Sequence, residues 1–212
     1  GMTEKKNVPK LRFPGFTGEW VEKKLKEVSK IIDPHPSHRA PERKKNGIPF
    51  IGIGDVNEVG EINYQSARLV AEKIYDEHNK RYDLNIPSIG IGRVASLGKV
   101  IRLRNDIGKY AISPTMSIIQ FNSDMILDYC YSYMTSSVFQ KQFAAQSNGS
   151  TRQSVGIQHL RELKIKIPFY RMEQFKIGIF FANFDHLIAL NQRKLDHLEQ
   201  KKKGLLQKLF PG

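Results

Sequence analysis

The sequence predicts an α+β protein in which a mixed α/β globular region is followed by one long coiled-coil helix. Two patterns support this. Before Pro168, short β-branched runs alternate with glycine and proline, whereas after it apolar residues recur at helical spacing over a long proline-free segment. Hydrophobic residues make up 40% of the 212 residues, enough for a buried core, so wholesale disorder is not expected.

The globular region is expected to contain both strands and helices, in roughly the 150 residues typical of one domain. Strands are predicted at 48–56, 86–94, 99–103, 111–121 and 163–167, where β-branched residues are bounded by turn residues. Helical patterns cover 67–82 and, with a strong amphipathic pattern, 125–146.

A sequence frame occurs twice in this region. Pro-x-Ile-Gly-Ile-Gly-x-Val-x-x-(Val/Leu)-Gly-x-(Ile/Val) runs from Pro49 to Ile62 and again from Pro87 to Val100. We interpret each copy as a buried strand leading through a glycine-containing turn into a second strand, used twice in one sheet.

The long helix is predicted from about Glu173 to Leu209, roughly 36 residues or about 54 Å. Its seam positions fall alternately four and three residues apart, and eight of the ten are apolar. Such a 3.5-residue period predicts a coiled coil with another helix, and the two polar positions penalise slipped registers. The alternative is that the stripe packs on the protein's own globule. The seam positions are Ile177, Phe181, Phe184, Ile188, Asn191, Leu195, Leu198, Lys202, Leu205 and Leu209.

The chain is strongly basic, with 34 Lys and Arg against 21 Asp and Glu, a formal net charge of +13. From residue 173 onward there are 7 basic and 4 acidic residues, so ten of the excess charges lie in the preceding region. This imbalance favours a polyanionic partner, nucleic acid ahead of a membrane surface. The alternative for each basic cluster is a solvated surface. The candidate contacts are Arg39, Arg43, Lys44 and Lys45 in a proline-flanked loop, and Arg93, Ser96 and Lys99 around the second frame.

A further polar loop runs from Asn148 to Ser154 and joins the 125–146 helix to the next element. Arginine and glutamine make bidentate contacts to guanine and adenine edges, and serine and threonine bind phosphate. We therefore expect base or near-base contacts from Ser150, Thr151, Arg152 and Gln153, the alternative being an ordinary linker.

No catalytic or metal constellation is evident. Gly92 and Gly98 are separated by five residues, not the four of a P-loop, and Val100 replaces its hydroxyl residue. Glu162-Leu-Lys164 has a Glu-x-Lys nuclease spacing but no upstream Pro-Asp. His35 and His38 lie in a proline-broken stretch, interpreted as a solvated loop, without a third metal ligand.

Cysteine content and hydropathy indicate the cellular environment in which the protein is expected to work. Cys130 is alone, which excludes a disulfide framework and a cysteine-based zinc site and fits a reducing cytosol; its pattern indicates a core position. No apolar run of about 18 residues occurs and the first ten residues are polar, so neither a membrane span nor a signal peptide is expected.

Several strings, covering nearly the whole chain, resemble the specificity (S) subunit of type I restriction-modification systems. The most specific is the Pro168-Phe-Tyr-Arg-Met-Glu-Gln174 entry into a long helix that ends in Leu-Leu-Gln-Lys-Leu-Phe210. The others are Val8-Pro-Lys-Leu-Arg-Phe-Pro-Gly-Phe-Thr-Gly-Glu-Trp20, Leu25-Lys-Glu-Val28, the Ile48-to-Ile62 frame, the Gly-Ser-Thr-Arg-Gln-Ser154 loop and Phe184-Asp185-x-x-Ile188.

The resemblance implies a DNA target-recognition domain at 1–168 and a long conserved helix at 169–212. Family members usually carry two such units, each reading one half of a bipartite double-stranded DNA sequence, with the helices paired as an antiparallel coiled coil. This chain carries one unit, so the resemblance implies a second copy or a second half as its partner.

The resemblance also implies binding without chemistry by this chain. Methyltransferase (M) and restriction (R) subunits of a prokaryotic cytoplasmic complex are expected to bring S-adenosylmethionine, ATP and Mg²⁺, with no cofactor on this chain. Two alternatives stay open: a stand-alone DNA-acting enzyme such as a nuclease, and a coiled-coil adaptor whose charge is incidental.

Overall fold

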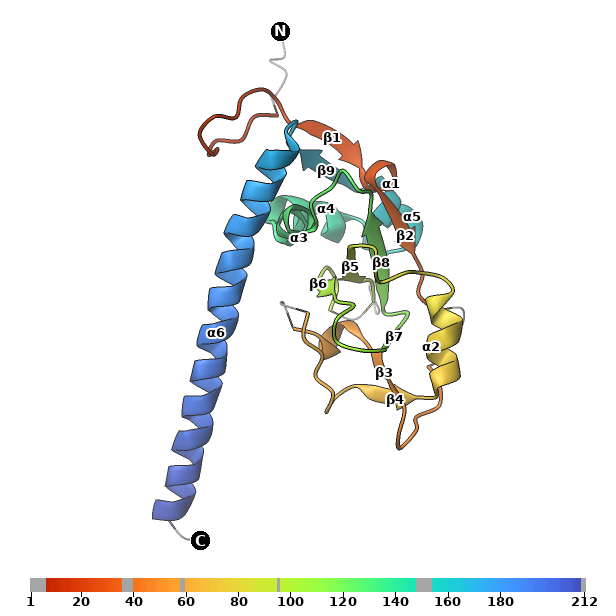
Figure 1. Cartoon of the computed structure of the whole chain (residues 1–212), viewed down its shortest axis with the longest axis vertical. Helices are drawn as coiled ribbons and strands as arrows, with labels where there is room; N and C mark the ends of the chain where they lie inside the picture. Colours follow the sequence, from red (N-terminus) through yellow and green to blue (C-terminus); the bar gives the residue numbers. More distant parts are fainter. Residues whose placement is uncertain (1–6, 36–39, 58–59, 95, 148–153, 211–212) are drawn as a thin grey trace.

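The computed structural model describes residues 7–35, 40–57, 60–94, 96–147 and 154–210. They form an α+β globule with one long helix beside it, as the sequence predicts (Figure 1). The elements are β1 (Val21–Lys24), α1 (Leu25–Val28), β2 (Ser29–Ile32), β3 (Ile48–Ile51), the 3₁₀ helix η1 (Ile53–Asp55), β4 (Arg68–Val70), α2 (Glu72–Asn79), β5 (Ser88–Gly92), β6 (Val100–Leu103), β7 (Ala111–Ile112), β8 (Met116–Phe121), α3 (Leu127–Thr135), α4 (Ser137–Ala145), α5 (Ile157–Glu162), β9 (Lys164–Ile167) and α6 (Arg171–Leu209).

A four-stranded antiparallel sheet, in the order β2-β8-β5-β6, forms the centre of the globule. Every residue of β8 is buried, because both faces of the sheet are covered. Ile119 belongs to the core cluster that includes α3 and α4 residues, whereas Ile118 belongs to a second cluster with residues of β3 and β7. Successive strand residues point to opposite faces, so this one strand contributes to two cores.

A smaller sheet, in the order β4-β3-β7, covers the second face. It contains the first copy of the repeated frame, whereas the second copy forms the β5-β6 hairpin of the larger sheet, so the prediction that both copies share one sheet is wrong. In the first copy the Asp55 carboxylate accepts a hydrogen bond from the Gly52 amide (2.8 Å), and the chain turns into η1. Of its expected second strand, the described residues form the isolated Val56–Ile62 bridge.

Three predicted elements are divided in the structure. The 67–82 helix is β4 followed by α2, because 68–70 pair with β3. The 125–146 helix is interrupted at Ser136, which takes an extended backbone and caps α4 through a hydrogen bond from the Phe139 amide to its Oγ (3.4 Å). The 111–121 strand is divided by a turn at Pro114 into β7 and β8.

The strand pair β1-β9 connects the beginning of the globule to the residues just before α6. The Arg12 guanidinium bonds the Glu173 carboxylate at 2.7 Å and 2.8 Å, and Glu173 is fully buried in the first turn of α6. Gly178 then lets α6 approach α3 closely, since a Cβ at this position would lie 2.7 Å from the Tyr129 amide nitrogen. The base of α6 is therefore packed firmly against the globule.

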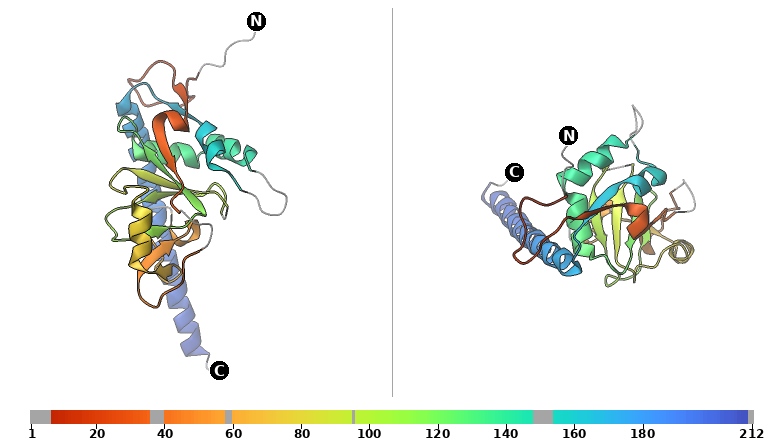
Figure 2. Two further views of the ribbon diagram at one scale, coloured as in Figure 1. Left: turned by 90° about the vertical axis from the view of Figure 1, so that its right-hand side faces the viewer. Right: turned by 90° about the horizontal axis from the view of Figure 1, so that it is seen from above.

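Beyond its base, α6 runs alongside the globule and extends past it (Figures 1 and 2). Apart from Gly204, every residue of its C-terminal half is exposed. Within the described ranges, no helix combines the length and the apolar character that crossing a bilayer requires.

Candidate nucleic-acid interface

Three of the predicted DNA contacts lie together on the exposed segment that precedes β3. Arg43, Lys44 and Lys45 line a cleft of about 390 Å³ with Tyr64 and Gln65. The Lys44 amide donates to the Leu69 carbonyl (2.9 Å), which fixes the backbone of this segment, and its ammonium pairs with Glu42 at 2.8 Å. The segment thus presents a cluster of exposed cations on an ordered backbone.

Arg93 lies in a second cleft, of about 510 Å³, which Ala40 and Ser154 also line. Its side chain is only 15% exposed, and its Nη2 contacts the Asp33 carboxylate (3.4 Å) and the Pro114 carbonyl (3.2 Å). Two lining residues of the cleft, Ala40 and Ser154, directly follow residues 36–39 and 148–153 in the sequence. Arg39, Ser150, Thr151, Arg152 and Gln153, predicted as contacts, lie outside the described residues.

Ser96 and Lys99 lie in the β5-β6 connection. Ser96 is exposed, and its φ of 46° makes it the non-glycine residue with a left-handed backbone among those described. The Lys99 ammonium donates to the Val56 carbonyl (2.9 Å) and is half-buried. Both stay predicted contacts, and the Lys99 bond ties this connection to the end of η1.

His35 is buried, so its interpretation as part of a solvated loop is wrong. Its ring lies 4.3 Å from that of His78 and 5.7 Å from that of Phe50, between centroids. Burial lowers the pKa of His78 to about 4, and both rings are part of the packing between α2 and β3. Among the residues that the structure describes, no three His, Cys, Asp or Glu side chains are grouped to hold a metal ion.

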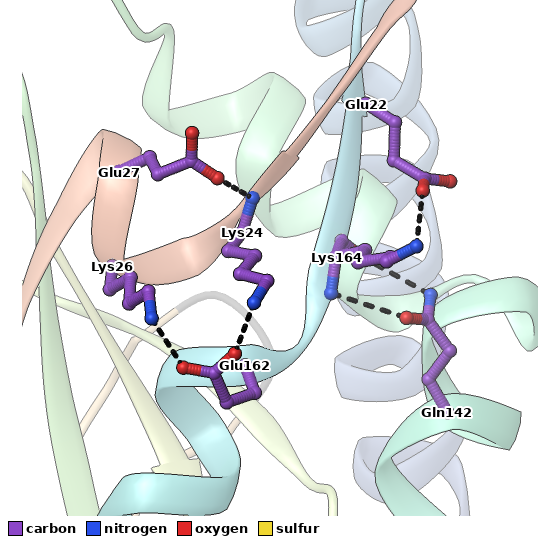
Figure 3. Close-up of polar contacts among 7 residues, drawn as sticks. All are labelled: Glu22, Lys24, Lys26, Glu27, Gln142, Glu162 and Lys164. Atoms are coloured by element: carbon purple, nitrogen blue, oxygen red, sulfur yellow. Dashed lines mark hydrogen bonds and ion pairs between the residues drawn. The ribbon is translucent and has the colours of Figure 1, made fainter.

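The Glu-x-Lys pair at the end of α5 is held in ion pairs (Figure 3). The Glu162 carboxylate accepts hydrogen bonds from the ammonium groups of Lys24 and Lys26, each at 2.5 Å, and Lys164 pairs with Glu22 at 2.7 Å. The two lysines lower the pKa of Glu162 to about 2. These contacts connect β1 and α1 to α5 and β9, so the pair has a structural role.

Replacing Glu162 with glutamine is expected to lower the urea midpoint of unfolding slightly at pH 7, because exposed ion pairs contribute little. The folded-state pKa lies below the usual 4.5, so the contribution is complete above pH 4.5 and is lost as the pH falls toward 2. The midpoint difference from the wild type should therefore shrink below pH 4.5. A difference that stays constant down to pH 3 would contradict this assignment, and Glu19→Gln, at another exposed carboxylate, is the control.

The predicted seam of α6 is largely uncovered by the chain itself. Ile177 packs against the core and Phe181 lines a cleft between α3 and α6. Farther along, the seam side chains are exposed: Phe184 49%, Ile188 65%, Leu195 49%, Leu198 60%, Leu205 52% and Leu209 70%, with Asn191 and Lys202 also exposed. The alternative that this stripe packs on the protein's own globule is thus wrong beyond Phe181.

The sequence model of the family described as type I restriction modification DNA specificity domain matches residues 17–200, which include most of the globule and of α6. The chain belongs to this family. The specificity-domain fold is also found in solved structures. The S subunit of a type I restriction-modification system from M. genitalium superposes with a TM-score of 0.60 at 17% identity, over 92% of this chain and 46% of that one. The HsdS subunit from Thermoanaerobacter tengcongensis gives 0.56 at 16% identity, over 98% and 48%.

One curated relative, from Methanocaldococcus jannaschii, carries the name of a type I restriction enzyme MjaX specificity subunit. It is 24% identical over 213 aligned residues, which cover 98% of this chain and 49% of the relative. This chain therefore spans about half the length of the relatives that it matches.

Sequence reasoning missed the polar residues that complete the two clefts and the ion pairs that attach α6. Tyr64, Gln65 and Thr115 come from segments distant in sequence from the cations beside them. No local spacing reveals such neighbours, because the β3-β4 and β5-β8 pairings create them.

Proposed function

We propose that this chain is the non-catalytic subunit that gives a type I restriction-modification complex its DNA sequence specificity. The observation that carries this proposal is a basic globule of the specificity-domain family beside a long helix with an exposed apolar seam. The globule, residues 1–168, reads one half of a bipartite target. The helix, residues 169–212, sets the distance to the other half.

In this proposal the exposed cations Arg43, Lys44 and Lys45 neutralise phosphates next to the groove that is read. Base or near-base contacts come from residues 150–153, which directly precede Ser154 in the sequence, and Ser154 lines the cleft that contains Arg93. Arg93 and Lys99 donate hydrogen bonds to the carbonyls of Pro114 and Val56. Their contribution to DNA binding therefore includes positioning the segments that contain Pro114 and Val56. Arg39 and Ser96 complete the proposed contact set.

The seam needs a second helix, which we propose comes from a second copy of the chain or from a second half, in antiparallel orientation. Leaving a stripe of leucine and isoleucine in water is unfavourable, and a partner helix covers it. An antiparallel pair places one recognition domain near each end, related by a two-fold axis. M and R subunits then dock on this assembly in the prokaryotic cytoplasm and supply S-adenosylmethionine, ATP and Mg²⁺.

Co-expression with the methyltransferase subunit, followed by mapping of methylated genomic positions, tests this proposal. A two-fold symmetric split motif is expected from two copies of the chain, and an asymmetric one from pairing with a different half. Absence of any sequence-specific methylation would contradict the proposed function.

Replacing Arg43, Lys44 and Lys45 with alanine is expected to weaken DNA binding about equally at cognate and unrelated sequences, since phosphate contacts carry no sequence information. The slope of log K against log salt concentration should fall by about 0.9 for each phosphate that the variant no longer neutralises. Fluorescence anisotropy titrations of the assembled complex at several salt concentrations measure both effects.

The matched control removes the same charge from α6 by replacing Lys194, Lys201 and Lys203, all exposed, with alanine. This control should leave the salt slope near that of the wild type. Equal slopes for all three proteins would exclude the 43–45 segment from the DNA interface.

A further inference from the structure

Two ion pairs join α6 to the globule beyond its packed base. The first centres on Arg102 of β6, whose side chain is 14% exposed. Its Nε bonds Asp128 of α3 at 3.1 Å, its Nη2 bonds Asp185 of α6 at 3.0 Å, and its guanidinium lies 3.6 Å from the centroid of the Tyr131 ring. One guanidinium therefore connects the central sheet, α3 and α6.

The second ion pair lies two turns farther along the helix, where Arg193 Nη2 contacts Glu61 Oε1. Glu61 is held in place by Asn57, whose side-chain amide bonds the other carboxylate oxygen (2.8 Å) and accepts a hydrogen bond from the Glu61 amide (2.8 Å). Arg193 is the largest cause of a lowered pKa at Glu61. The carboxylate is thus oriented toward α6 by its own loop.

Both ion pairs leave the apolar seam free. The seam residues Ile188, Asn191 and Leu195 occupy the a and d positions of the heptad repeat. Arg193 then occupies an f position, on the side of the helix opposite the seam. Asp185 lies at the edge of the seam, on the side of Gly178, which faces α3. A partner helix and the two ion pairs can therefore contact α6 at the same time.

The angle between α6 and the globule matters because DNA spacing is discrete. From Gly178 to the middle of the 39-residue helix is about 18 Å, at 1.5 Å per residue. If α6 tilts by about 10° around Gly178, the middle of the helix moves by about 3 Å, which is close to the 3.4 Å rise of one base pair. A single exposed ion pair is weak. Two ion pairs at different distances along α6 nevertheless resist a tilt of the helix better than the packing at its N-terminal end alone.

We propose that the Arg102–Asp185 and Glu61–Arg193 ion pairs fix the angle of α6 to the recognition domain and so restrict the complex to one spacing between its half-sites. The inference that the complex accepts one spacing between half-sites rests on the proposed function, whereas the inference that the angle of α6 is fixed does not. These four are positioning residues: they act on the distance between two reading sites and leave the contacts to bases unchanged.

The angle is tested first on the chain itself, by electron-electron double resonance between spin labels at Lys80→Cys and Lys203→Cys. Both positions are exposed, and the native Cys130 is buried and stays unlabelled. Dilution with unlabelled chain restricts the signal to distances within one copy. The wild type should give one narrow distance distribution.

Arg193→Glu should broaden or shift this distribution, and the exchange Glu61→Arg with Arg193→Glu should restore it. Asp185→Asn, a milder change at the first pair, should broaden it as well. Lys109→Glu, which breaks the exposed Glu72–Lys109 pair within the globule, is the matched control and should leave it narrow. Identical distributions in all variants would overturn the proposal.

Methylation mapping of the complex with the methyltransferase subunit then tests the spacing. Arg193→Glu should add sites whose spacer differs by one base pair, with both half-sites unchanged, and the charge exchange should return the single spacing. A broadened angle with an unchanged spacing would overturn the spacing consequence. If the wild type methylates no split site while the distance results hold, the proposed function fails and the fixed angle stands.

Discussion

Replacing Leu195 and Leu198 of α6 with aspartate is expected to dissociate the proposed helix-paired assembly into single chains. In a two-copy pair the change removes four leucine burials, each contributing about 1.5–3 kcal/mol, and puts charges in their place. Because each 1.4 kcal/mol changes affinity tenfold, the dissociation constant should rise by at least about a thousandfold. Light scattering should then give the 24.3 kDa mass of one chain.

The matched control places aspartate at Gln200 and Lys203, each five residues farther along α6 than the corresponding leucine and outside the seam. It should keep the wild-type mass, because those side chains face solvent in the pair as they do in the single chain. An unchanged mass for the seam variant, together with intact methylation in the complex, would rule out the coiled coil as the mode of assembly.

Gly178→Ala is expected to destabilise the protein relative to Gly204→Ala, although both glycines lie in the same helix. A Cβ at Gly178 would lie 2.7 Å from the Tyr129 nitrogen and 2.9 Å from the Asp128 Cβ, so α6 must move away from α3. Overpacking of this kind costs about 1–3 kcal/mol.

At Gly204 nothing lies within 4 Å of the added methyl group, so this variant should gain about 1 kcal/mol from helix propensity alone. The propensity gain is shared by both variants, so their difference in free energy of unfolding isolates the packing cost at Gly178. Urea denaturation monitored by circular dichroism measures it. Equal stabilities would mean that α6 is not held closely against α3.

The elements that the sequence predicts correctly are those in which a local pattern and the tertiary environment agree. The β-branched runs of β5, β6 and β9 are strands, and the heptad segment is helical from Arg171 to Leu209. The errors lie where a distant partner or a single side chain decides. Residues 68–70 have a helical pattern but pair with β3, and Ser136 ends one helix and caps the next.

The same distinction applies to the candidate site. Exposed cations such as Arg43 could be predicted because charge near prolines indicates a surface loop. Arg102 and Arg104 alternate with apolar residues along a strand, a pattern that also suits phosphate contact, but Arg102 is bound by Asp128 and Asp185, 26 and 83 residues away. Arg104 pairs with Asp106 at 2.7 Å. For Arg102, spacing cannot reveal acidic partners that only folding brings near, whereas the partner of Arg104 lies two residues along the same chain segment.

The pairing of β1 with β9 has a consequence for how such proteins can diversify. Because the strand that opens the globule lies beside the strand that closes it, at the base of α6, the chain enters and leaves the domain at nearly the same place. Everything between Lys24 and Lys164 is therefore a cassette with adjoining ends. If the globule reads DNA as we propose, exchange of that cassette by recombination would give a new target sequence, while the strand pair at the helix base is inherited intact.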